Sequence, residues 1–247
     1  MSIPQIIAHR GNKSVAPENT LPAFAAAIKS GAGSIEMDVV LSRDGVAMVI
    51  HDETLDGTTS GVGDVGDFTA DQIQGLDAGS WFDPAFAGVR VPRFDQFADL
   101  MAKHPSVEVL LEFKGDWSPE QAQTVVDSVN RAGIMDQTIL QSFSRVTVES
   151  LLKIAPDSRR GILIVEDFDE LVELATFAKI YTINPEVSWV LENPDFVDTL
   201  HEAGIKTQVW TADFPEQWAA LVDLGVDAII TDCPDRLAGW YAGRGLI

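Results

Sequence analysis

Short apolar runs alternate with segments of helical periodicity along this chain, and such an alternation predicts an α/β fold with a parallel sheet. The length of 247 residues is close to the usual size of a TIM (β/α)8 barrel. Hydrophobic residues make up 46% of the chain, enough to fill one large core. We therefore expect a single domain over residues 1–247, folded as a TIM (β/α)8 barrel.

Nine segments have the short apolar pattern of buried strands, one more than a simple barrel needs. They are Ile6–His9, Ser34–Leu41, Val46–His51, Val107–Phe113, Thr138–Ser142, Arg160–Val165, Ile180–Ile183, Lys206–Trp210 and Ala228–Thr231. Helical periodicity fills many of the intervals, and residues such as Asn19 and Ser118 are expected to cap the helices. The expected helices are Thr20–Ser30, Pro119–Ala132, Arg145–Ile154, Phe168–Ala178, Pro194–Ala203 and Pro215–Leu224.

The third expected strand is the surplus one, because only Ser42-Arg43-Asp44-Gly45 connects it to the second. So short a connection cannot carry a parallel crossover, but it suits a β-hairpin. We expect this extra strand to run antiparallel to the second, outside a ring of eight parallel strands. A turn centred on Arg43-Asp44 would set His51 opposite Glu36 and Val49 opposite Asp38. A slip of one or two residues would still return His51 to these carboxylates.

The stretch between His51 and Arg93 is rich in Gly, Asp and Thr and has no sustained periodicity. Its aromatic residues, Trp81, Phe82 and Phe86, are candidate anchors. We interpret residues 53–92, approximately, as a small inserted subdomain after the second strand rather than a second domain. Long loops on the catalytic face of a barrel often shape the substrate pocket.

The charge balance is strongly acidic, with 17 Lys and Arg against 38 Asp and Glu and a formal net charge of −21. This balance argues against a broad basic surface that grips nucleic acid or an anionic membrane. A phosphate-bearing ligand would need local cations or a metal. The single Cys233 cannot form an internal disulfide, and no apolar run approaches the roughly 18 residues of a membrane span. With no leader pattern in Met1–Gln5, we expect a cytoplasmic protein without stable membrane association.

Polar residues follow the first expected strand as His9-Arg10-Gly11. An arginine fork matches phosphate or carboxylate oxygens, and a glycine lets the backbone approach a ligand. The alternative is a basic dipeptide at a surface turn.

Glu36 and Asp38 are two residues apart on one expected strand, so both side chains point to the same face. Two acids on the inward face of a barrel strand are costly unless they are paired or bound to a metal. Glu112 and Lys114 share a face in the same way on the next strand, where a structural ion pair would also explain them. Three hard carboxylate donors would suit Mg²⁺ or Ca²⁺ better than zinc.

Histidine is rare in this chain, and two of its four histidines, His9 and His51, fall at strand ends among these acids. The other two, His104 and His201, lie at or near the ends of expected helices and are interpreted as surface residues. Two converging imidazoles could act as general acid and general base. The sequence does not say which histidine has which role.

The order and spacing of these motifs resemble the glycerophosphodiester phosphodiesterase family over nearly the whole chain. The matching segments are Ala8-His9-Arg10-Gly11, Pro17-Glu18-Asn19-Thr20, Glu36-Met37-Asp38-Val39, His51-Asp52, Thr54-Leu55-Asp56, Thr58-Thr59, Leu76-Asp77-Ala78-Gly79-Ser80-Trp81-Phe82, Val91-Pro92, Leu111-Glu112-Phe113-Lys114, Gln141-Ser142-Phe143, Trp210-Thr211 and Thr231-Asp232-Cys233-Pro234. The chain departs from the usual pattern at Gly57, Arg93-Phe94 and Asp213.

The resemblance implies hydrolysis of glycerophosphodiesters, such as glycerophosphocholine or glycerophosphoethanolamine, to glycerol 3-phosphate and an alcohol. It implies His9 and His51 as the acid/base pair, and one divalent cation, Mg²⁺ or Ca²⁺, on Glu36, Asp38 and Glu112. By the same comparison Arg10 and Lys114 would hold the phosphate. Trp210 would lie against the glycerol or its leaving group, or alternatively plug the barrel mouth.

Two other functions stay open at this point. Another metal-dependent barrel hydrolase, or a phospholipase of related chemistry, would act on intact lipid. The acidic charge and the lack of a basic or amphipathic membrane-binding segment count against it. A non-catalytic binding module is expected to lack a histidine or a ligand acid, and none is missing. The expected partner is a small glycerophosphodiester, with no nucleic acid and with a homodimer as one possibility.

Overall fold

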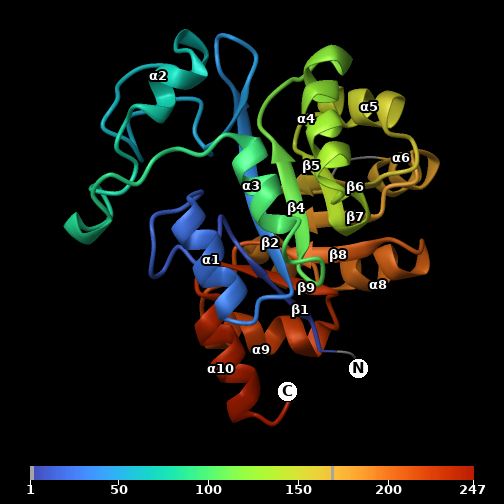
Figure 1. Ribbon diagram of the computed structural model, residues 1–247. Coiled ribbons are helices and arrows are strands. Elements are labelled where there is room, and N and C mark those ends of the chain that lie inside the picture. Colours follow the sequence, from blue (N-terminus) through green and yellow to red (C-terminus); the bar gives the residue numbers. More distant parts are fainter. Residues whose placement is uncertain (1–2, 168–169) are drawn as a thin grey trace.

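Within the described residues, 3–167 and 170–247 of the computed structural model, eight parallel strands close into a barrel (Figure 1). Its ring closes because β1 pairs in parallel with both β2 and β9. The ring strands are β1 (Gln5–Ala8), β2 (Ser34–Leu41), β4 (Glu108–Phe113), β5 (Thr138–Ser142), β6 (Arg159–Ile164), β7 (Thr182–Pro185), β8 (Lys206–Val209) and β9 (Ala228–Thr231). The predicted TIM (β/α)8 barrel is thus confirmed.

Helices surround this barrel, and most of the buried apolar side chains form one core between the helices and the strands. The helices are α1 (Leu21–Lys29), α2 (Ala70–Gln74), α3 (Phe94–Met101), α4 (Pro119–Ala132), α5 (Arg145–Ile154), α6 (Leu171–Phe177), α7 (Val187–Glu192), α8 (Asp195–Glu202), α9 (Pro215–Leu224) and α10 (Pro234–Gly243). The prediction omitted α2, α3, α7 and α10. Its helix Phe168–Ala178 starts at a residue outside the described part, and α6 covers most of the remainder. Among the described residues, no helix has the length and apolar character needed to cross a membrane.

The extra strand, β3 (Ala47–Val49), lies outside the ring and pairs antiparallel with β2, as predicted. Its register differs by one residue from the prediction, because Val39 rather than Asp38 faces Val49. Residues 42–46 connect the two strands, and Gly45, at φ +75°, occupies the left-handed position that favours glycine. The strand ends at Val49, so His51 does not pair with Glu36 in the ladder.

Residues 53–92 follow β3 and form a separate group of short elements beside the barrel (Figure 1). They include α2 and two short 3-10 helices, Val65–Asp67 and Pro84–Phe86. Apolar residues of this segment, among them Leu55 and Ile73, pack against Val40 and Met48 in a second, smaller buried cluster. The description of the chain as one domain with an insertion here stays a prediction.

The inside of the barrel changes in character along its axis. Ile7, Leu110, Ile139 and Ile230 form a buried apolar cluster in its interior. Two residues beyond Ile7 and Leu110, towards the carboxyl ends of the strands, the same faces carry His9 and Glu112. The barrel therefore has a packed floor beneath a polar upper end, where barrel enzymes place their active sites.

Candidate active site

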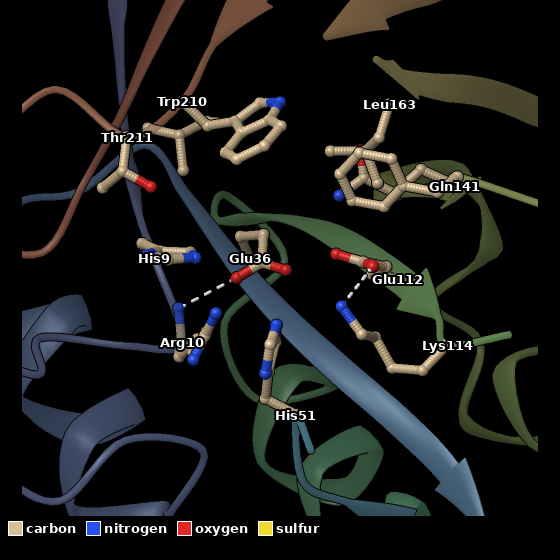
Figure 2. Close-up of a pocket in the computed structure, with 12 residues that line it drawn as sticks. His9, Arg10, Glu36, His51, Glu112, Lys114, Gln141, Leu163, Trp210 and Thr211 are labelled. Atoms are coloured by element: carbon tan, nitrogen blue, oxygen red, sulfur yellow. Dashed lines mark hydrogen bonds and ion pairs between the residues drawn. The ribbon is translucent and has the colours of Figure 1, made fainter. Parts of the chain in front are cut away.

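A pocket opens at the carboxyl ends of the barrel strands (Figure 2). Every predicted site residue lines it except Asp38, which is fully buried beneath. The lining residues are His9, Arg10, Glu36, His51, Glu112, Lys114, Gln141, Phe143, Leu163, Trp210, Thr211 and Ile230. Residues far apart in the sequence are thus brought to one place by the strands.

Glu36, Asp38 and Glu112 form a compact carboxylate cluster inside this end of the barrel. The two-residue spacing puts Glu36 and Asp38 on one face of β2, and Asp38 is the register partner of Glu112 on β4. All three residues are buried, and one oxygen from each lies within 4.8 Å of the others. Oδ1 of Asp38 has no hydrogen-bond partner among the described residues. Three hard oxygen donors, one of which makes no hydrogen bond, fit a divalent cation.

Burial and mutual repulsion disfavour full ionisation of the three carboxylates. Burial and the charges of Asp38 and Glu112 raise the pKa of Glu36 well above its usual range. Burial and the charge of Asp38 raise the pKa of Glu112 to about 7. Burial also disfavours ionised Asp38, but the charges of Arg10 and Lys114 outweigh it and lower the pKa of that carboxyl. A cation between these groups would relieve the repulsion.

Two cationic side chains lie beside the carboxylates. Arg10 donates from Nη1 to Glu18 Oε1 at 2.7 Å, and its Nε lies 3.5 Å from Asp38 Oδ2. Lys114 donates from Nζ to Glu112 Oε1 at 2.7 Å and lies 3.7 Å from Asp38 Oδ1. The ion pair between Lys114 and Glu112 that the sequence left as an alternative is therefore present. Both cations also line the pocket, where an anion would meet them.

The two histidines reach the pocket from different elements, and Figure 2 shows both rings directed towards Glu36. His9 follows β1, and its Nδ1 lies 2.6 Å from Asp232 Oδ1. His51 follows β3, and its Nδ1 lies 2.6 Å from Asp52 Oδ1. Burial lowers the pKa of His9, although the hydrogen bond to Asp232 opposes this shift. Each ring thus has one nitrogen held by a carboxylate.

Trp210 forms part of the pocket wall opposite the carboxylates (Figure 2). Its Nε1 donates to the backbone oxygen of Asn184 at 2.7 Å. Its ring meets Phe143 edge to face, with centroids 5.5 Å apart. These contacts hold the indole as a fixed apolar surface facing the pocket.

Several polar residues support the site, although the sequence analysis assigned them no role there. Asn19, expected as a helix cap, instead donates from Nδ2 to Asp38 Oδ2 at 2.8 Å, and Thr20 is the N-cap of α1. Glu18 binds Arg10, and Asp232 binds His9. Their positions in the motifs that follow the first and last strands were the available signal. The contact of Asp232 with His9 exists only in the closed barrel, where β1 and β9 are neighbours.

The fold and the site define a barrel enzyme. A carboxylate cluster, two cations and two histidines lie together at the carboxyl ends of its parallel strands. The family model described as "Glycerophosphoryl diester phosphodiesterase family" matches residues 9–236. A glycerophosphodiester phosphodiesterase of Caldanaerobacter subterraneus subsp. tengcongensis is 35% identical over 94% of this chain and 95% of its own. One from Bacillus altitudinis is 31% identical over 94% of this chain and 96% of its own.

Solved structures show the same similarity. A glycerophosphodiester phosphodiesterase from Agrobacterium tumefaciens is 34% identical with a TM-score of 0.83, covering 96% of this chain and 99% of its own. An Oleispira antarctica phosphodiesterase, solved in complex with the product sn-glycerol-3-phosphate, is 25% identical with a TM-score of 0.91 and covers 97% of both chains. The chain belongs to the glycerophosphoryl diester phosphodiesterase family.

Proposed function

We propose that this protein hydrolyses glycerophosphodiesters, such as glycerophosphocholine or glycerophosphoethanolamine, to glycerol 3-phosphate and an alcohol. The observation that carries the proposal is the buried cluster of Glu36, Asp38 and Glu112, with two cations and two histidines at the same pocket. Membership of the family and the relatives named as glycerophosphodiester phosphodiesterases support the substrate class. The Oleispira antarctica relative, whose complex holds sn-glycerol-3-phosphate, supports the product.

We propose Glu36, Asp38 and Glu112 as ligands of one divalent cation, Mg²⁺ or Ca²⁺. The donor set fits, because all three groups are carboxylates within 4.8 Å of one another and Oδ1 of Asp38 makes no hydrogen bond among the described residues. When bound, such a cation would neutralise negative charge that develops on the phosphoryl oxygens.

In this proposal Arg10 and Lys114 bind the non-bridging phosphate oxygens and stabilise their charge as the leaving group departs. One of His9 and His51 takes a proton from the nucleophile, which is water or the neighbouring glycerol hydroxyl. The other gives a proton to the departing oxygen. Trp210 provides the fixed apolar wall against which the glycerol or the leaving group rests. The cytoplasmic location and the homodimer stay predictions.

The test measures glycerol 3-phosphate release from glycerophosphocholine and glycerophosphoethanolamine with Mg²⁺, with Ca²⁺ and after chelation. We expect release with at least one metal, and loss of release in His9→Ala and Glu36→Gln. His104→Ala is the matched control, because His104 lies on the loop after α3 outside the pocket. No release with either metal, or equal release by all three variants, would overturn the proposal.

A further inference from the structure

We propose that Asp232 is a positioning residue, which fixes the ring of His9 for catalysis. This inference rests on the proposed function, in which His9 transfers a proton. The sequence places the two residues 223 positions apart, but the barrel joins them. Ala8 and Thr231 are register partners on β1 and β9, and His9 donates its backbone N–H to Thr231 O at 2.9 Å. His9 and Asp232 therefore come directly after the ends of two neighbouring strands.

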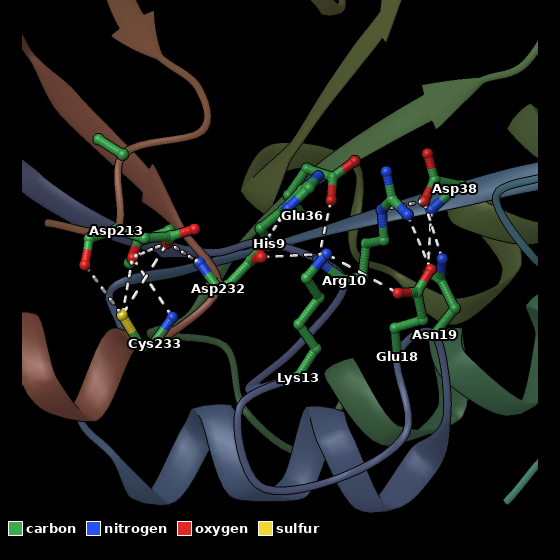
Figure 3. A network of polar contacts seen from close by, with 12 residues as sticks. His9, Arg10, Lys13, Glu18, Asn19, Glu36, Asp38, Asp213, Asp232 and Cys233 are labelled. Carbon is green, nitrogen blue, oxygen red and sulfur yellow. Dashed lines mark hydrogen bonds and ion pairs between the residues drawn. The ribbon is translucent and has the colours of Figure 1, made fainter. Parts of the chain in front are cut away.

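Asp232 is held through both its backbone and its carboxylate (Figure 3). Its backbone N–H donates to Asp213 Oδ1 at 2.8 Å, and its backbone oxygen accepts from Ser14 N at 3.1 Å. Lys13 Nζ lies 3.1 Å from Oδ2, which leaves Oδ1 to face His9 at 2.6 Å. Backbone contacts and a cation thus fix the carboxylate before any substrate is bound.

The chemistry of a carboxylate then determines the state of the imidazole. An ionised carboxylate only accepts hydrogen bonds, so Nδ1 of His9 must carry the shared proton. Burial disfavours the charge on Asp232, but the hydrogen bond and charge of His9, with Lys13, lower the pKa of Asp232 overall. In neutral His9 the unprotonated nitrogen is therefore Nε2, the nitrogen on the far side of the ring from Asp232. The ring presents one defined nitrogen for proton transfer.

The same network reaches the phosphate-binding arginine. Lys13 Nζ also lies 3.7 Å from Glu18 Oε2, and Glu18 Oε1 accepts from Arg10 Nη1 at 2.7 Å. Asp232 and Glu18 are thus two acids joined by one lysine, each holding a different site residue. Removing the carboxylate of Asp232 should therefore change the orientation of the His9 ring, while Arg10 keeps its hydrogen bond to Glu18.

The test compares Asp232→Asn with Asp227→Asn in the glycerol 3-phosphate assay. Asp227 is the matched control, because it holds His201 at 2.9 Å in a similar pair that lies outside the pocket. Asparagine keeps the size of the side chain but can donate to Nδ1 and favour the other tautomer. For Asp232→Asn we expect kcat to fall by about 10²–10⁴-fold with KM little changed, the usual range of general acid–base effects. Asp227→Asn should keep the kcat of the unmodified protein.

Two further measurements separate positioning from a structural role. In a His9→Ala background, adding Asp232→Asn should lower kcat no further, because the residue acts through His9. Nitrogen chemical shifts of the His9 ring should report the Nδ1–H tautomer in the unmodified protein and its loss in Asp232→Asn. This spectrum would reveal misfolding as a general change in all histidine signals.

The outcomes distinguish this inference from the proposed function. Full activity of Asp232→Asn beside an inactive His9→Ala would overturn the role of Asp232 and leave the proposed function intact. A further loss of tenfold or more in the double variant, or an unchanged tautomer in Asp232→Asn, would also overturn it. Full activity of His9→Ala would instead refute the catalytic role of His9.

Discussion

Replacing Glu112 by glutamine should stabilise the metal-free protein and at the same time weaken metal binding. Glu112 is buried, and burial together with the charge of Asp38 raises its pKa to about 7. The ordinary pKa of a glutamate in the unfolded chain is lower, about 4.3. The folded protein therefore favours the protonated side chain, whose contribution to stability is fully present below about pH 4.3. That contribution is lost as the pH rises through about 7, where the carboxylate ionises.

The size of this effect follows from the difference between the two pKa values. One pKa unit corresponds to about 1.4 kcal/mol, so a shift of two to three units corresponds to about 3–4 kcal/mol once Glu112 is ionised in both states. Glutamine resembles the protonated form and avoids this cost. For a chain of this size, such a difference should raise Tm by roughly 6–16 °C. At pH 5 the folded side chain is still protonated, and the gain should shrink to about 1 kcal/mol.

Thermal unfolding of chelated protein at pH 5 and pH 8 measures both values. Glu202→Gln is the matched control, because Glu202 is exposed at the end of α8. Adding Mg²⁺ or Ca²⁺ should raise the Tm of the unmodified protein but not that of Glu112→Gln, since only a bound ligand stabilises the folded state. Equal Tm values for Glu112→Gln and the unmodified protein at pH 8 would refute the reasoning. So would a gain of the same size at pH 5.

Three other substitutions test separate parts of the structure. Arg10→Lys removes the fork that contacts Glu18 and should lower kcat/KM for glycerophosphocholine by about 10²–10³-fold; unchanged kinetics would contradict a role in binding phosphate. Gly11 has a φ of +85°, and Gly11→Ala would place a Cβ 2.7 Å from the backbone carbonyl carbon of Ala23. The substitution should displace Arg10 and lower kcat/KM by up to about 10²-fold, whereas an unchanged kcat/KM would show that the loop adjusts. Arg160→Met leaves backbone oxygens, including Ala155 O at 2.8 Å, without their buried donor. It should lower the free energy of unfolding by about 2–4 kcal/mol in denaturant titrations without changing kcat, and a loss of kcat in the folded variant would contradict this.

The carboxylate cluster could be predicted from the sequence because it depends on local geometry. Glu36 and Asp38 share a face through the two-residue repeat of one strand, which no tertiary contact needs to specify. Glu112 joins them because β4 is the next ring strand along the chain and pairs with β2. Short-range rules and the order of strands in a barrel were therefore sufficient for this part.

The register of β3 shows where local rules were insufficient. The prediction assumed a turn centred on Arg43-Asp44, but Leu41 faces Ala47, so the turn is centred on Asp44, with Gly45 in a left-handed conformation. His51 then depends on contacts beyond the hairpin, such as the hydrogen bond from Val49 N to Pro92 O at 2.8 Å. The neighbourhood of His51 was predicted, but its partner in the ladder was wrong.

Helix α3 was missed although its apolar residues have helical spacing. Phe94, Phe97, Ala98 and Met101 recur at the intervals of one helix face and are buried against the barrel. The segment follows closely on the irregular residues 53–92, and the helix is only eight residues long. Asp232 was missed for another reason, because its contact with His9 exists only when the first and last strands meet.

The pairing of β1 with β9 makes the active site depend on closure of the barrel. His9 follows the first barrel strand and Asp232 follows the last, so during synthesis this pair cannot form until residue 232 has left the ribosome. Such a non-local contact forms only after a long loop has closed, which is a slow event in folding. Catalytic turnover in a refolding experiment would therefore appear only with the final closure of the ring, later than the helical signal.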